Sequence, residues 1–194
     1  MSKQFPQFHF VRKHKKALLA VILVLATISA ALAVVFHTWP HLWWLIFRPR
    51  VSLEGKVDCF IIHWADGKTM TLSPQTPEGK RLVAACEDVI SNLDARLLLM
   101  TTDDNVEWMK NRSDYVDVRL KSVYNFTFFC FDSAQLYNVE AKEILMFVSS
   151  CITVMFDGKP YGGQVRWGSN FSIGSESKYS QQLRNIVDQL RALA

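Results

Sequence analysis

"IIHWADGKTMTLS" occupies residues 61–73, and its pattern predicts a β-hairpin. Residues with strand propensity alternate on both sides of Asp66-Gly67, as they do in two strands that each have one buried face. Gly67 can adopt the positive φ that a tight primed turn requires, and Asp is a favoured turn residue beside it. Asp66 and Gly67 are therefore predicted to be structural turn residues.

"TVMFDGKPYGGQVRW", residues 153–167, places the same Asp-Gly-Lys between two further strand patterns. Asp157 and Gly158 are predicted to form the second turn, and the lysine after each turn is expected to be solvated. The pattern lacks the glycine spacing and the strand-to-helix setting of a phosphate-binding loop. An amphipathic helical pattern follows each hairpin, so the chain is predicted to contain two strand–turn–strand–helix units, residues 57–93 and 152–193.

The sequence between these units adds further strands and one short helix. "YVDVRLK" (115–121) alternates cleanly and predicts a strand with one solvated face, in which Asp117 points outward. "VYNFTFFCF" (123–131) and "ILMFVSSCITVMF" (144–156) are apolar enough to be central strands. We expect an α+β domain over residues 51–194, with a mainly antiparallel sheet and two or three packed helices.

"ALLAVILVLATISAALAVVF", residues 17–36, contains no charged side chain. At about 1.5 Å per residue, a helix of this length spans a hydrocarbon core of about 30 Å. The segment 17–38 is therefore predicted to be a transmembrane signal anchor. The alternative is a cleavable signal peptide, because Ala31-Leu32-Ala33 fits the small-residue cleavage pattern, but the apolar run continues to Phe47.

Charge is divided sharply along the chain. Residues 1–50 carry seven basic side chains and no acidic one, and the rest of the chain carries 15 basic and 18 acidic side chains. The overall charge of +4 thus reflects a basic membrane flank and does not indicate nucleic-acid binding. Four basic residues stand just before the apolar run: Arg12, Lys13, Lys15 and Lys16. The positive-inside rule then predicts a cytoplasmic tail over residues 1–16 and a C-terminal domain outside the cell membrane.

Residues 39–50 are predicted to form an interfacial linker. Trp39, Trp43 and Trp44 have the amphipathic rings that favour the membrane–water interface, and Arg48 and Arg50 are expected to reach headgroup phosphates. The alternative is that some of these tryptophans pack beneath the outer domain.

Candidates for catalysis are few. His63, the one histidine after residue 50, shares a strand face with Cys59, and the two are the only weak candidates for a nucleophile and its base. The sequence predicts no cofactor and no metal site, because it contains no zinc, nucleotide or calcium motif. The four cysteines are expected to be buried free thiols; Cys59–Cys86 and Cys130–Cys151 would be the shortest disulfide loops.

These patterns favour a single-pass membrane protein of the cell envelope with an extracytoplasmic binding or sensing domain. Its expected partners are the lipid bilayer and a neighbouring membrane protein, envelope polymer or peptide, and no nucleic acid. The alternative function is a membrane-tethered hydrolase that uses His63 with Cys59 or with a carboxylate. A reversed topology, with a cytoplasmic domain and reduced cysteines, is the third possibility.

Overall fold

The computed structural model describes residues 15–38, 50–97, 102–133, 135–157, 167 and 169–194. The chain divides into two units, Met1–Phe47 and Arg48–Ala194. The linker tryptophans, Arg48 and Gly158 lie outside the described residues, so their predicted roles stay predictions.

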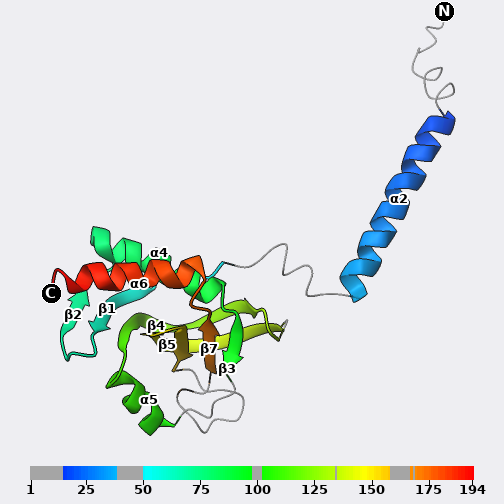
Figure 1. The fold of residues 1–194 in the computed structure, drawn as a ribbon. Coiled ribbons are helices and arrows are strands. Elements are labelled where there is room, and N and C mark those ends of the chain that lie inside the picture. The colour runs from blue at the N-terminus through cyan, green and yellow to red at the C-terminus, as the bar shows by residue number, and fades with distance from the viewer. Residues whose placement is uncertain (1–14, 39–49, 98–101, 134, 158–166, 168) are drawn as a thin grey trace, which may run out of the picture. The chain divides into compact units, whose positions relative to one another are not determined.

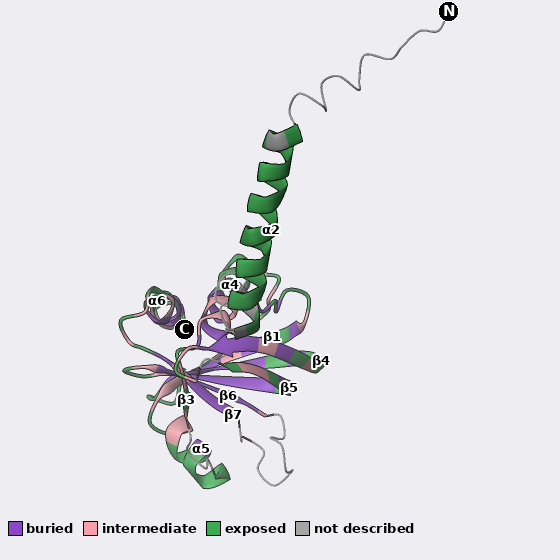
Figure 2. Ribbon diagram, turned by 90° about the vertical axis from the view of Figure 1, so that its right-hand side faces the viewer, coloured by how far each residue is buried: buried purple, intermediate pink, exposed green. Residues whose placement is uncertain are grey.

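The first unit contains helix α2, Lys15–Thr38. Ala17–Val35 is long and apolar enough to cross a membrane, and it is the one such helix in the described residues. Its large apolar side chains are exposed along the whole length, from Leu18 to Val35 (Figure 2). Because no side of α2 is polar, this helix does not have the pattern of a helix that packs one face on a soluble core.

In its described residues the second unit contains seven strands and three helices; Figure 1 labels all of them except β6, which is labelled in Figure 2. The strands are β1 Val57–His63, β2 Thr69–Leu72, β3 Ala95–Leu97, β4 Asp114–Cys130, β5 Gln135–Val148, β6 Ile152–Phe156 and β7 Ser169–Ile173. The helices are α4 Pro77–Ser91, α5 Asp103–Lys110 and α6 Lys178–Arg191. The strands form one antiparallel sheet in the order β2-β1-β4-β5-β6-β7-β3. The predicted α+β class is confirmed.

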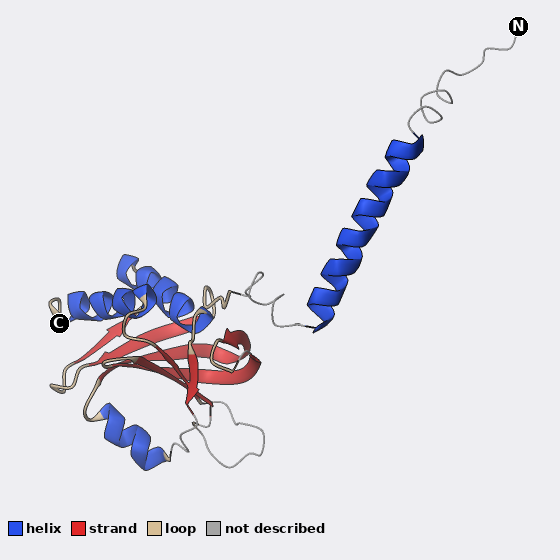
Figure 3. Cartoon of the chain, turned by 45° about the vertical axis from the view of Figure 1, so that its right-hand side comes forward, coloured by secondary structure: helices blue, strands red, loops and turns tan. Residues whose placement is uncertain are grey.

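Helices α4 and α6 lie side by side on one face of this sheet, and α5 lies on the opposite face (Figures 1 and 3). The helix spacing explains the packing, because the apolar residues of α4 and α6 recur every three or four positions. Leu82, Cys86 and Val89 on α4 are fully buried, as are Leu183 and Val187 on α6. Each large apolar side chain buried here contributes about 1.5–3 kcal/mol.

In the second strand–turn–strand–helix unit, the described strand that pairs with β6 is β7, Ser169–Ile173. The predicted returning strand, residues 161–168, lies outside the described residues except for Trp167, so it stays a prediction. The following helix is capped by Ser177, whose Oγ accepts the N–H of Tyr179.

Strand β4 continues without a break through residues expected to form two strands. The pairing of β4 with β5 shifts register between Arg119 and Tyr124, where β4 bulges by several residues. Beyond the bulge the hairpin bends towards β7, and Phe128 packs edge-on against Phe171 with ring centroids 4.7 Å apart. A bulge bends the strand that carries the extra residues, so both halves of β4 can bury apolar side chains in one core.

The first hairpin turn is wider than the primed turn that the sequence predicted. The Gly67 N–H donates to the Trp64 carbonyl, and the Trp64 N–H donates to the Lys68 carbonyl. This pattern encloses a three-residue loop, a known hairpin type that places glycine at its last position. Gly67 has φ +87°, and the Asp66 carboxylate accepts the N–H of Lys68. Gly67 therefore has the positive φ that the sequence pattern predicts, although the turn is of a different type.

We expect Gly67→Val to lower the free energy of unfolding by about 1–3 kcal/mol, because a β-branched residue resists positive φ. A Cβ at position 67 would meet no atom within 4 Å, so the cost comes from the backbone. Chemical denaturation measures it, with Lys68→Ala as the control, which we expect to stay within about 0.5 kcal/mol. An unchanged stability in Gly67→Val would contradict this role of the glycine.

Candidate functional site

Residues 50–56, here called the connecting segment, lead into the domain and are held against helix α4. Val51 and Leu53 are buried in the main core, so the segment is anchored by apolar contacts. Gly55 has φ +72°, and the N–H groups of Lys56 and Val57 donate to the Leu53 carbonyl. The chain therefore turns at Gly55 and passes directly into β1.

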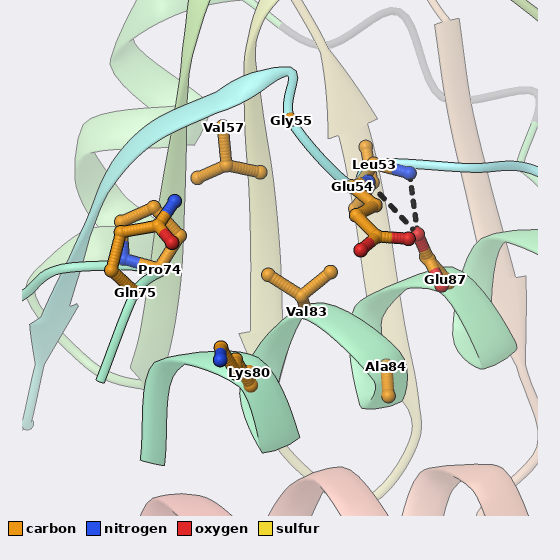
Figure 4. A pocket seen from close by; sticks show the side chains of 10 residues that line it. All are labelled: Leu53, Glu54, Gly55, Val57, Pro74, Gln75, Lys80, Val83, Ala84 and Glu87. Atoms are coloured by element: carbon orange, nitrogen blue, oxygen red, sulfur yellow. Dashed lines mark hydrogen bonds between the residues drawn. The ribbon is translucent and has the colours of Figure 1, made fainter. Parts of the chain in front are cut away.

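Two side chains of α4 fix the backbone of the connecting segment. Glu87 Oε1 accepts the N–H of Leu53 at 2.6 Å and that of Glu54 at 3.1 Å (Figure 4). Ser91 Oγ accepts the N–H of Val51 at 2.9 Å. Hydrogen bonds to an ionised carboxylate are about twice as strong as neutral ones. Glu87 is thus the main polar attachment between the start of the domain and α4.

A cavity of about 440 Å³ lies between the connecting segment, the loop after β2 and helix α4. This volume falls within the range of small-molecule sites, roughly 300–1,000 Å³. The cavity is lined by Leu53, Glu54, Gly55, Val57, Pro74, Gln75, Lys80, Val83, Ala84 and Glu87.

The positively charged and negatively charged side chains of the cavity lie at opposite ends. Lys80 and Gln75 lie towards one end, and Glu54 and Glu87 lie at the other (Figure 4). The half-buried Val83 faces the space between these ends, and the buried Val57 lies beside it (Figure 4). The arrangement offers a cation and an amide at one end, carboxylates at the other, and an apolar surface between them.

The sequence around the start of α4 fixes the wall that carries Lys80. Thr76 caps the helix by accepting the N–H of Gly79 at 3.0 Å, and Pro77 takes the first helical position, where no N–H is needed. A Cβ at Gly79 would clash with the Ser73 carbonyl oxygen, so glycine allows the helix to approach the loop closely. The loop and the helix thereby hold the Gln75 and Lys80 side of the cavity.

The opposite face of the sheet carries an ion-pair cluster. Arg119 lies between two buried carboxylates, with one nitrogen 2.7 Å from Asp117 and 3.3 Å from Glu143. The prediction that Asp117 lies on a solvated face is wrong, because its carboxylate is buried against Arg119, and its neighbour on β5, Leu145, belongs to the apolar cluster on this face. A smaller cavity of about 340 Å³ adjoins the cluster at the β4 bulge and includes Cys59 and Asp157.

His63 and Cys59 do not form a nucleophile–base pair. They are four residues apart on one extended strand, so their Cα atoms lie about 13 Å from each other. Burial, followed by the charges of Asp58 and Asp117, raises the pKa of the Cys59 thiol. A reactive cysteine requires a lowered pKa, so the thiol version of the hydrolase hypothesis lacks both the geometry and the thiolate.

His63 is a packed aromatic residue, as a lone histidine on a strand usually is. Its ring stacks on Tyr115 with centroids 4.3 Å apart and planes within 10°. In the described part of the chain no carboxylate hydrogen-bonds its ring. Partial burial lowers the pKa of His63, and the charges of Lys110 and Arg119 lower it further.

All four cysteines are free thiols, as expected, and neither of the two shortest possible disulfide loops is formed. Cys86 and Cys130 are buried as expected, whereas Cys59 and Cys151 are only half-buried. Among the residues that the structure describes, no group of three His, Cys, Asp or Glu side chains is placed to hold a metal ion.

The remaining predicted site residues have structural surroundings. Arg50 is exposed at the start of the connecting segment. Asp66 forms a 2.7 Å ion pair with Arg191, which ties the hairpin turn to the end of α6. Asp157 accepts the N–H groups of Lys142 and Glu143 through Oδ1, so its side chain supports β5 at the bulge.

No sequence pattern indicated the residues that line the cavity. Glu87 occupies the polar side of an amphipathic helix, where a solvated carboxylate is the ordinary expectation. Its partners are backbone groups 33 and 34 residues earlier, and backbone groups leave no pattern in the side chains.

Comparison with protein-family models, with curated proteins and with solved structures found no match for this chain.

We expect Glu87→Ala to lower the free energy of unfolding by about 1–3 kcal/mol, because two backbone N–H groups lose their charged acceptor. Hydrogen exchange at residues 51–56 should become faster at the same time. Asp88→Ala is the matched control on the next position of α4, and it should change neither quantity. Equal exchange rates in the two variants would contradict the attachment through Glu87.

The lowered pKa of His63 predicts a pH dependence of stability. Since the unfolded chain binds a proton at this site more readily, protonation favours unfolding. The contribution of His63 to the free energy of unfolding is complete above pH 6.5, the ordinary pKa of histidine. It is lost as the pH falls through the lower pKa of His63 in the folded state. In fragment 50–194, His63→Phe should retain the stack on Tyr115 and flatten the stability profile between about pH 7.5 and pH 5. If the free energy of unfolding of the two proteins changed equally with pH over this range, the assignment of the pH dependence to His63 would be wrong.

Proposed function

We propose that this chain is a single-pass membrane protein whose α+β domain lies outside the cytoplasm and binds a small ligand. One observation carries the binding function. The cavity beside α4 takes one of its walls from the connecting segment, which is the part of the domain nearest in sequence to the apolar helix. A ligand in this cavity contacts both α4 and the chain that leads to the membrane.

The anchor is supported by the composition and exposure of α2. The apolar part, Ala17–Val35, is 19 residues long, about 29 Å of helix, which matches the hydrocarbon core of a bilayer. Exposed apolar surface of this extent is unfavourable in water, at about 25 cal/mol per Å². Insertion into a bilayer removes that cost.

The orientation is supported by charge. Four basic residues precede the apolar helix closely, and only Arg48, Arg50 and Lys56 follow within a short distance. Basic residues are retained on the cytoplasmic side, so the domain is placed outside. The partners considered from sequence, a neighbouring membrane protein, an envelope polymer or a peptide, are all accessible to a domain in this position.

The topology is tested by fusing reporters after Ala194 of the full chain. A reporter that is active only outside the cytoplasm should be active there, and a tag placed before Met1 should remain on the membrane-bound protein. Replacing Arg12, Lys13, Lys15 and Lys16 by Gln should reduce the fraction with the domain outside, because the basic residues that remain lie mainly after the span.

Two results would contradict this assignment. Activity of a cytoplasm-only reporter after Ala194 would reverse the topology. Loss of the N-terminal tag from the mature protein would identify residues 17–36 as a cleaved signal peptide.

A further inference from the structure

The cavity beside α4 has charges of opposite sign at its two ends. Lys80 has no ion-pair partner within the described residues, and neither has Glu54. Glu87 uses only Oε1 in its bonds to the connecting segment. Each end of the cavity therefore has ionic groups available to a ligand.

The distance between the ends limits the ligand. Lys80 and Glu87 are seven residues apart on α4, so their Cα atoms are separated by about 10 Å along the helix axis. The ammonium and carboxylate of a free α-amino acid are attached to the same carbon and cannot reach both ends. A chain of two or three residues, at about 3.3–3.6 Å per residue, has its terminal charges at a suitable separation.

The surface between the ends suits a small apolar side chain. The half-buried Val83 and Pro74 and the exposed Ala84 supply the apolar lining between the ends (Figure 4). Gln75 can donate to a carbonyl or accept from an amide, as a peptide backbone requires. A molecule with two charged ends, an amide backbone and small apolar side chains matches each part of the lining.

We propose that this cavity binds a di- or tripeptide with free termini, its ammonium group at Glu54 and Glu87 and its carboxylate at Lys80. The assignment rests on the proposed binding function and specifies its ligand class. The bound ammonium lies against the carboxylate that holds Leu53 and Glu54, so peptide binding also restrains the connecting segment.

Isothermal titration calorimetry of the full chain in detergent tests the ligand class with defined probes. Tri-alanine with free termini should bind, whereas N-acetyl tri-alanine, tri-alanine amide and free alanine should each bind at least about tenfold more weakly. A lost charge-assisted hydrogen bond costs about this factor or more. Binding of tri-alanine should also slow hydrogen exchange at residues 51–56.

Variants identify the two ends. Lys80→Met should weaken tri-alanine at least about tenfold and abolish the preference for a free carboxylate. Glu54→Gln, at an exposed position, should reduce the preference for a free ammonium without loss of folding. Lys110→Met, on α5 and away from the cavity, is the matched control and should leave binding unchanged.

The outcomes separate this inference from the proposed function. Tri-alanine that gives no heat and no exchange protection at about 10 mM, enough to saturate a millimolar site, overturns the peptide assignment. Equal binding of capped and free peptides also overturns it. A cytoplasmic domain that still binds tri-alanine would overturn the localisation and retain the peptide site.

Discussion

The structure of the domain depends on covering one face of an antiparallel sheet with two helices. Successive side chains of a strand point to opposite faces, so the strands of this sheet present a continuous apolar surface that α4 and α6 bury. Each helix follows a hairpin directly in the sequence and returns across the strands that precede it. Because this face supplies the main core, the other face can accommodate Arg119 between two carboxylates, together with the small apolar cluster under α5.

Much of this core could be predicted from local periodicity. The apolar stripe of α4 and the hairpin at Gly67 depend on residues close together in sequence, and both are present. The single strand β4 could not be predicted, because the bulge after Arg119 interrupts the alternation and only pairing with β5 keeps the strand continuous. The burial of Asp117 was missed for a similar reason: it depends on the ion pair with Arg119 and on pairing with β5, which lies later in the chain.

The candidate site was the part of the structure that could be predicted least from the sequence. Its carboxylate and its lysine are unremarkable on the polar side of an amphipathic helix. They line a cavity only because residues 50–56 turn back over α4. That turn depends on the buried side chains of Val51 and Leu53 and on the positive φ of Gly55. His63 and Cys59, the weak catalytic candidates by residue type, are too far apart to act together and have packed surroundings.

The attachment of the connecting segment also determines how the domain would respond to mechanical load. If the preceding helix were anchored in a membrane, tension along the chain would reach the described part of the domain at Arg50. It is then borne first by the bonds of Ser91 and Glu87 to the backbone of Val51, Leu53 and Glu54. Lys121, whose N–H and ammonium group donate to the carbonyls of Lys56 and Gly55, provides the next point of resistance. Detachment would therefore begin by peeling residues 51–54 from α4, and the ladder between β1 and β4 would be loaded only afterwards.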